Sequence, residues 1–339
     1  MENDMRLLVI SKIIVFLAIA SSMVAVQAAE EDTPVNWVFA SDPQYPWTDK
    51  SDSGEDESQG AKKERSAKLI TQQYQSIAQF RQAQGGADAV PVMINGDMTA
   101  YGHSGERSYI NKVLQKELGG RYDYGLGNHD YENNVDDCFL NGCAAGSLDE
   151  YIARYWVRGA NIDLFSRAES GFTRVFYGSL AYAKDWGRVH LIQLNNEPTY
   201  TVNIESGVFL ARVKYEITSA LDWLEKDLEM ARQAGKIIII NVHKPQWWDG
   251  NREEFERFKQ MIEKYEVTAV FAGHYHGTVG KYRADRDLFG EVPVFLSGSA
   301  SQQTYLVASL SADYKQLEVY AVQGNDWRNR KLESVIDIK

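Results

Sequence analysis

Short apolar runs recur along the chain and are separated by longer polar or amphipathic stretches. Segment 237–242 holds five β-branched residues interrupted only by Asn241, a pattern typical of a strand covered on both faces. The other runs have the length and the flanking turn residues of strands. We expect strands at 36–41, 89–95, 122–126, 172–177, 181–185, 189–194, 237–242, 267–272, 292–296, 304–310 and 316–322.

Apolar residues return at helical spacing in several of the intervening stretches. Ile217, Leu221, Leu224 and Leu228 share one face of segment 216–233, and Gly235 follows where a glycine commonly ends a helix. The run of Asp, Ser, Gly and Glu at 48–66 predicts a solvated loop instead. We expect helices at 67–84, 106–118, 148–157, 216–233 and 253–264.

The expected strands alternate with helices in some places and follow one another as hairpins in others, which predicts an α/β fold with mixed sheets. Segment 131–174 is rich in Asn, Gly and aromatic residues and predicts an elaborated loop region. The roughly 310 residues that follow the N-terminal segment suffice for one large α/β domain or two small ones.

The first 28 residues have the pattern of a signal peptide. Arg6 and Lys12 precede an apolar core at 13–20, and residues 26–28 form a small-x-small cleavage site. A membrane anchor is the alternative, but the apolar stretch is shorter than the roughly 20 residues of a membrane span. We therefore expect export to the periplasm or the medium. Since no later segment approaches that length, we expect no stable membrane insertion after cleavage.

The net charge of −11 argues against nucleic acid and anionic lipid as partners. A protein of this charge that handles phosphates needs a local source of positive charge, and bound metal would supply it. The two cysteines, Cys138 and Cys143, enclose four residues. In an oxidising compartment they predict a small disulfide loop, with two free thiols as the alternative.

Polar clusters follow five of the expected strands directly. In open α/β sheets the binding crevice lies beyond the carboxyl ends of the strands, so we expect these clusters to converge on one crevice. The clusters are Asp42-Pro43-Gln44, Gly96-Asp97, Gly127-Asn128-His129-Asp130, His243 and Gly273-His274-Tyr275-His276.

The clusters contain four of the six histidines in the chain, and only His103 and His190 lie elsewhere. Imidazole and carboxylate together suit Mn, Fe and Zn. The set is large enough for two ions about 4 Å apart, which can activate a water and bind phosphate oxygens at once. A lone Gly-Asp after a strand is usually a turn, whereas the two near-adjacent histidines of Gly-His-Tyr-His seldom arise as packing. All five clusters in this order are hard to explain by structure only.

This series of motifs resembles the calcineurin-like metallophosphoesterase superfamily, over about 36–322 of the chain. The resemblance implies a single domain at 29–339 with a four-layer α/β/β/α sandwich, two mixed β-sheets and a dinuclear site at the sandwich edge. It implies that His129 protonates the leaving oxygen or stabilises the transition state, with Asp130 orienting its ring. It assigns Asp42, Gln44, Asp97 and His276 to one metal and Asp97, Asn128, His243 and His274 to the other.

Two positions depart from the usual motifs of that superfamily. The first motif is usually Asp-x-His, whereas here Gln44 offers only a neutral amide oxygen, which favours Mn over Zn, with Fe or Zn as the other possible metals. A minority of the superfamily, including proteins similar to manganese-dependent ADP-ribose pyrophosphatase, has Gln there. Ala100 stands where purple acid phosphatases have tyrosine, so a purple iron site is not expected.

Several residues near the motifs have two interpretations. Trp47, Trp247 and Trp248 either line a pocket or cover the domain, and Lys244 and Tyr275 either contact phosphate or serve the fold. His103 either reaches the substrate or lies on the surface, and mid-strand His190 is expected to be packed.

The sequence thus predicts an exported, metal-dependent phosphoester hydrolase that acts on a small phosphorylated substrate. The alternatives are a non-catalytic binding protein on the same fold, or a phosphodiesterase acting on nucleotide or lipid head-group substrates.

Overall fold

The chain forms three β-sheets in a computed structural model that describes residues 33–157, 159–169, 172–208 and 211–339. The expected signal peptide at 1–28 lies outside the described residues. The six-stranded sheet has the order β17 (Lys331–Asp337), β16 (Gln316–Val322), β15 (Tyr305–Leu310), β1 (Asn36–Ala40), β2 (Val92–Ile94), β3 (Asp123–Tyr124).

The seven-stranded sheet contains the run of β-branched residues at its centre. Its order is β13 (Val279–Tyr282), β14 (Val294–Ser297), β12 (Ala269–Ala272), β11 (Ile237–Val242), β8 (Val189–Gln193), β7 (Tyr182–Trp186), β4 (Asn161–Ile162). The four-stranded sheet has the order β5 (Phe165–Ala168), β6 (Arg174–Gly178), β10 (Val213–Ile217), β9 (Val202–Ser206).

Parallel and antiparallel pairs occur in all three sheets. β1, β2 and β3 run parallel, as do β8, β11, β12 and β14, whereas β15, β16 and β17 in the six-stranded sheet and β13, β7 and β4 in the seven-stranded sheet pair antiparallel. The prediction of an α/β fold with mixed sheets is confirmed. The four-stranded sheet was not expected, since its strands are short and only partly apolar.

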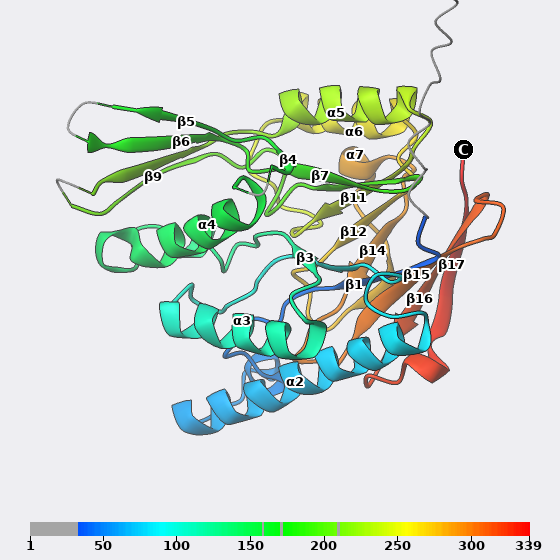
Figure 1. Ribbon diagram of the computed structural model, residues 1–339, viewed down its shortest axis with the longest axis horizontal. Helices are drawn as coiled ribbons and strands as arrows, with labels where there is room; N and C mark the ends of the chain where they lie inside the picture. The colour runs from blue at the N-terminus through cyan, green and yellow to red at the C-terminus, as the bar shows by residue number, and fades with distance from the viewer. Residues whose placement is uncertain (1–32, 158, 170–171, 209–210) are drawn as a thin grey trace, which may run out of the picture. The chain divides into compact units, whose positions relative to one another are not determined.

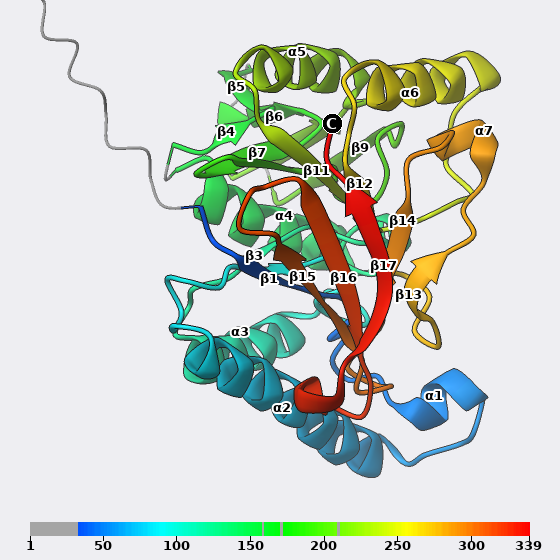
Figure 2. The ribbon, with the colours of Figure 1, turned by 90° about the vertical axis from the view of Figure 1, so that its right-hand side faces the viewer.

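Helices cover the outer faces of the two larger sheets (Figures 1 and 2). α2 and α3 lie against the six-stranded sheet, while α5 and α6 lie against the seven-stranded sheet. The helices are α1 (Asp49–Ser53), α2 (Gln59–Ala83), α3 (Ser104–Leu118), α4 (Gly142–Tyr155), α5 (Leu221–Gln233), α6 (Arg252–Lys264) and α7 (Arg286–Phe289).

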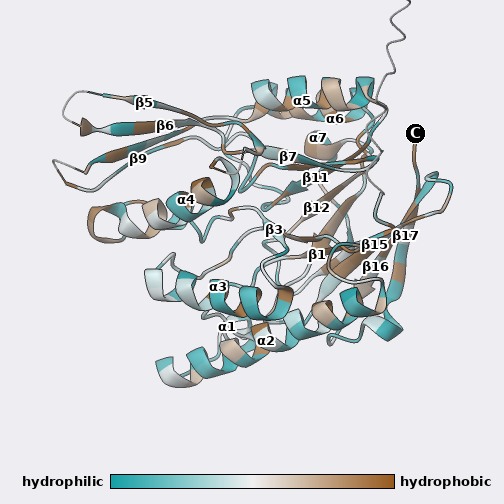
Figure 3. Ribbon diagram, in the orientation of Figure 1, coloured by the Kyte–Doolittle hydropathy of each residue, from teal (hydrophilic) through white to brown (hydrophobic). Residues whose placement is uncertain are grey.

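The central strand β11 is buried on both faces, as its composition predicts. Ile237 and Ile239 belong to the core between the two larger sheets, whereas Ile238 and Ile240 pack under α5 and α6. Across the inter-sheet core, Phe39 stacks on Phe271 with ring centroids 3.7 Å apart. Figure 3 shows hydrophobic colouring on the inner strands and hydrophilic colouring on the outward faces of the helices.

Three expected elements are wrong in part. Segment 48–66 is not one loop, because Thr48 caps α1 and Ser58 caps α2, which begins at Gln59. The helix expected at 216–233 begins only at Leu221, since Glu216 lies in β10, which pairs with strands on both sides. Segment 131–174 is less irregular than expected and contains α4, β4 and β5.

The predicted disulfide between Cys138 and Cys143 is confirmed, with the two Cα atoms 5.7 Å apart. It closes a short loop immediately before and within the first turn of α4. Among the helices in the described part of the chain, none is long and apolar enough to cross a bilayer.

His190 on β8 is packed, as expected, and lies between two carboxylates. Its Nδ1 is 2.6 Å from Asp185 Oδ1, and its Nε2 is 2.8 Å from Asp227 Oδ2. Burial alone would lower the pKa of His190, but the hydrogen bonds and charges of Asp227 and Asp185 outweigh it and raise the pKa. The His190 ring therefore joins β7, β8 and α5 through these two contacts.

We expect this contact to make the free energy of unfolding depend on pH. Because the pKa of His190 is raised in the fold, its contribution is fully present below the unfolded value of about 6.5 and is lost as pH rises through the folded value. His190→Gln should cost about 3 kcal/mol at pH 6 and less at pH 9. Urea unfolding of both proteins at both pH values measures this, and an equal cost at the two pH values would contradict it.

Candidate active site

The seven predicted ligand side chains come from both larger sheets and meet where the carboxyl ends of parallel strands lie together. Asp42 and Gln44 follow β1, Asp97 follows β2, and Asn128 comes shortly after β3 in the six-stranded sheet. The seven-stranded sheet supplies the histidines, from the ends of β11 and β12: His243, His274 and His276.

The ligand atoms of the four residues assigned to one ion lie close to one another. Asp97, His243 and His274 each offer a ligand atom, and these atoms lie within 4.8 Å of each other. Asn128 Oδ1 is 2.9 Å from His243 Nε2 and 3.1 Å from His274 Nδ1. Carboxylate, amide and imidazole atoms thus lie close enough together to bind one cation.

The residues assigned to the other ion lie beside this group. His276 Nε2 is 3.3 Å from Asp42 Oδ1. Gln44 is 1% exposed, and among the described residues neither of its amide atoms has a hydrogen-bond partner. Buried polar atoms are rarely left unpaired, so the Gln44 amide oxygen fits a metal ion that completes its coordination.

The backbone at these strand ends is strained. Asp42, Gln44, Asp97 and His274 all have positive φ, at 50°, 37°, 50° and 72°. Such conformations cost on the order of 1–3 kcal/mol each and cluster at functional sites. Hydrogen bonds hold them, including Gln44 N–H to the Asp97 carbonyl at 2.9 Å. At Gly127 a Cβ would lie 2.2 Å from Asp97 Oδ1, so only glycine permits this approach.

Burial and mutual charge set the protonation of the histidines. Burial alone would lower the pKa of His243, but Asp97 outweighs it and raises the pKa to about 9. Burial and the neighbouring His243 lower the pKa of His274 to about 4. Burial would lower the pKa of His276, yet hydrogen bonds to Asp42 and a second carboxylate raise it to about 10. The cluster therefore attracts positive charge, and a metal ion binding there would displace protons.

His129 lines the same pocket but takes its orientation from the backbone. Its Nδ1 is 2.8 Å from the Ala100 carbonyl, so Nδ1 donates and Nε2 is the nitrogen left for substrate. Its own backbone N–H donates to Asp97 Oδ1 at 2.8 Å, which places the ring next to the metal ligands.

The expected contact between Asp130 and the ring of His129 is wrong. Asp130 is buried and its carboxylate accepts N–H groups from Met98, Thr99 and Gly127 at 2.9–3.2 Å. The tight turns after β2 and β3 leave these N–H groups without backbone partners, and a buried carboxylate satisfies them. Asp130 therefore fixes the loops that carry the ligands.

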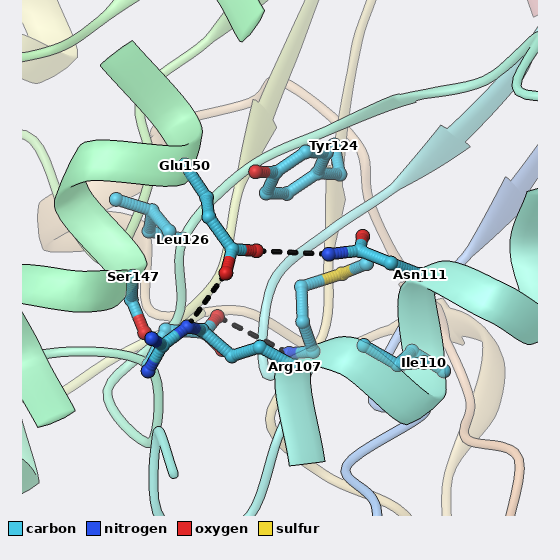
Figure 4. A pocket seen from close by; sticks show the side chains of 9 residues that line it. Arg107, Ile110, Asn111, Tyr124, Leu126, Ser147 and Glu150 are labelled. Carbon is cyan, nitrogen blue, oxygen red and sulfur yellow. Dashed lines mark hydrogen bonds and ion pairs between the residues drawn. The ribbon is translucent and has the colours of Figure 1, made fainter. Parts of the chain in front are cut away.

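A polar contact between α3 and α4 supports the turn that orients His129. Arg107 donates to Glu150 Oε1 at 2.9 Å and to the Gly102 carbonyl, and Asn111 donates to the other oxygen of Glu150 at 2.8 Å (Figure 4). Gly102 N–H in turn donates to Thr99 Oγ1 at 3.0 Å. Because Ala100 lies between these two residues, the contact fixes the carbonyl that bonds His129.

The structure shows which of the residues near the motifs line the pocket and which do not. Trp47 and Tyr275 line the pocket, which has a volume of about 490 Å³. Trp248 is buried in the core, whereas Trp247 is 74% exposed. Lys244 does not line the pocket, because it pairs with two carboxylates.

His103 is exposed at the start of α3, where its Nδ1 lies 3.0 Å from Glu106 Oε1.

The two carboxylates that pair with Lys244 belong to Glu197, 2.6 Å from Lys244 Nζ, and to Glu132, 3.2 Å from it. Burial raises the pKa of Glu197 to about 7.

Sequence reasoning missed Asp52, which lies in α1. Its Oδ1 is 2.6 Å from His276 Nδ1 and 2.7 Å from Trp47 Nε1. No local signal identifies it, because it lies in a polar run with other acidic residues and its partner His276 is 224 residues away.

The family model described as calcineurin-like phosphoesterase matches residues 39–278, a range that includes all seven ligand positions and His129. No curated protein matches the chain. Among solved structures, it is similar to a protein serine/threonine phosphatase from Saccharomyces cerevisiae with similarity to human phosphatase PP5. The identity is 10%, the TM-score is 0.31, and the match covers 91% of this chain and 81% of that one. The family to which the chain belongs is therefore identified from the family model alone.

Proposed function

Because the chain belongs to the calcineurin-like phosphoesterase family, whose members normally bind two metal ions, we propose that it hydrolyses phosphoesters at a dinuclear centre. The observation that carries the proposal is the convergence of Asp97, Asn128, His243 and His274 beside the Asp42–His276 pair and the unpaired buried amide of Gln44.

Each ligand group has a distinct task in this proposal. Asp42, Gln44 and His276 hold one ion, Asn128, His243 and His274 hold the other, and Asp97 lies between them and binds both. Two ions held in this way neutralise phosphate oxygens and supply an activated water. The neutral amide of Gln44 favours manganese, with iron and zinc as the alternatives.

His129 acts on the leaving group. Its Nδ1 is committed to the Ala100 carbonyl, so a proton at Nε2 is the one available to the departing oxygen. The side chain is half-buried beside Asp97, which places it next to the position that a bound phosphate would occupy.

The substrate in this proposal is a small phosphorylated molecule. The pocket is of ligand size, and the acidic chain gives no support for nucleic acid. We also propose that the protein is exported to the periplasm or secreted, on the basis of the signal-peptide pattern at 1–28.

Hydrolysis of p-nitrophenyl phosphate and of bis-p-nitrophenyl phosphate tests the function. With added Mn²⁺ we expect release of p-nitrophenol from at least one substrate, because the centre neutralises charge on the phosphate. The ratio of the two rates separates a monoesterase from a diesterase. No release from either, together with less than about one bound Mn²⁺ per chain, would instead indicate a non-catalytic protein on this fold.

A further inference from the structure

Both carboxylate oxygens of Asp52 accept hydrogen bonds at the edge of the candidate active site. Oδ1 accepts from His276 Nδ1 and from Trp47 Nε1, while Oδ2 accepts from Ser301 Oγ at 2.5 Å and from Gln302 Nε2 at 2.7 Å. The side chain is only 17% exposed. Four donors around one nearly buried carboxylate saturate its hydrogen-bonding capacity.

These bonds do not serve the short helix that contains Asp52. The N-terminus of α1 is capped by Thr48 and Ser51, which bond each other's backbone N–H groups. Asp49, the other acidic residue in the first turn, pairs with Arg65 on α2. Asp49 therefore fixes α1 to the rest of the fold, and Asp52 is left to act on the site.

The contact with His276 sets which nitrogen faces the metal position. Asp52 Oδ1 lies 2.6 Å from His276 Nδ1 and accepts its proton, while His276 Nε2 lies 3.3 Å from Asp42 Oδ1, so Nε2 is the nitrogen that faces Asp42. A carboxylate behind a ligating imidazole fixes its tautomer and makes it a stronger ligand.

The contact with Trp47 sets one wall of the pocket. The indole ring lies 5.8 Å from the ring of His129 and 5.9 Å from the ring of His276. Because its Nε1 donates to the same oxygen that holds His276, the two rings cannot move independently. A leaving group whose oxygen is within reach of His129 would lie against this wall.

We propose that Asp52 is a positioning residue that couples the first metal position to the leaving-group wall, and that the wall takes leaving groups with a flat ring. It holds His276 toward the ion and Trp47 toward the substrate through one carboxylate oxygen. The substrate class is then a phosphoester of an aryl or nucleoside alcohol, whose ring contacts the indole. This inference rests on the proposed function, since it assumes that the ion and the phosphate bind there.

Calorimetric titration of Mn²⁺ into the metal-free full-length chain tests the metal side. Asp52→Asn should weaken one of the two Mn²⁺ sites by about tenfold or more and leave the other unchanged. Asp88→Asn is the control, because it removes an exposed carboxylate that pairs with Arg121 away from α1 and from the site, and it should bind like the wild type. Equal Mn²⁺ affinity in the wild type and Asp52→Asn would overturn the proposal.

Steady-state kinetics test the wall. Asp52→Asn and Trp47→Leu should both raise KM for p-nitrophenyl phosphate by about tenfold and change KM for glycerol 2-phosphate little, because only the aryl ring contacts the indole. Trp47→Leu also removes one donor from Asp52, so it should weaken the same Mn²⁺ site by no more than about threefold. A KM that rises equally for both substrates would remove the flat-ring assignment. A purely structural role of Asp52 would lower the melting temperature and move neither Mn²⁺ affinity nor the KM ratio.

A second variant keeps the test decisive if Asp52→Asn does not fold. Gln302→Leu removes one donor from Asp52 and preserves its charge, so the same Mn²⁺ site should weaken by about threefold. No change in that variant would contradict the coupling. A wild-type chain that binds no Mn²⁺ would instead contradict the proposed function, so the two failures are distinguishable.

Discussion

Asp97→Asn is expected to abolish binding of both metal ions and to lower kcat/KM for an aryl phosphate by a thousandfold or more. In the proposed function Asp97 is the ligand shared by both ions: its Oδ2 lies 3.2 Å from His243 Nε2, and it lines the pocket together with Gln44. Loss of the shared charge removes several kcal/mol of transition-state stabilisation, and about 1.4 kcal/mol corresponds to each tenfold change in rate.

Metal content and kinetics are measured on the same preparation. The asparagine is isosteric and can still accept the His129 N–H, so the fold should survive, which a thermal melt verifies. Asp88→Asn is a suitable control, because the Asp88 side chain is 86% exposed and pairs only with Arg121 on the surface. An Asp97→Asn protein that retains two Mn²⁺ and wild-type activity would exclude Asp97 as the shared ligand.

His129→Ala is expected to lower kcat by about 10²–10⁴-fold while both metal ions stay bound. The loss should be larger for alkyl phosphates than for p-nitrophenyl phosphate, because nitrophenolate departs readily without a proton. The Ala100 carbonyl fixes the ring in the wild type and leaves Nε2 for the leaving group.

Kinetics with both leaving groups and metal analysis separate this role from metal binding. His103→Ala is the control, since His103 is exposed at the start of α3 and does not line the pocket. If His129→Ala lost metal in proportion to activity, or lost activity equally for both leaving groups, the ring would have a different task.

The positions of the ligands could be predicted because their signal is local. A buried strand such as Ile237–Val242 is recognisable from its β-branched residues, and a polar residue directly after it must lie at the sheet edge. The same reasoning placed Asp42, Asp97 and His274. Their positive φ values were not predictable, since most side chains at such turns adopt ordinary conformations.

The positioning residues could not be predicted because their partners are distant in sequence. The acidic run around Asp52 has the composition of a loop, and only the fold brings it to His276. Asp130 was given the wrong partner for a related reason. Adjacency to His129 suggested a contact with its ring, whereas unpaired N–H groups after β2 and β3 bind its carboxylate instead.

The four-stranded sheet was missed because periodicity alone does not distinguish a helix start from a strand end. Ile217 has helical spacing with Leu221, yet the backbone of Glu216 pairs with Tyr177 on one side and with Asn203 on the other. The hydrogen bonds that β10 makes with β6 and with β9 outweigh the weak helical preference of such a short segment.

The division of the ligands between two sheets has a consequence for how the protein matures. Asp42 and His276 are separated by most of the chain, so a nascent polypeptide cannot assemble the site until the strand that precedes His276 has been synthesised and has joined its sheet. Metal ions that bind afterwards would link the six-stranded sheet to the seven-stranded sheet, because each sheet supplies some of the ligands. Acquisition of metal would therefore be the closing event of folding, and chelation would loosen the junction between the two sheets first.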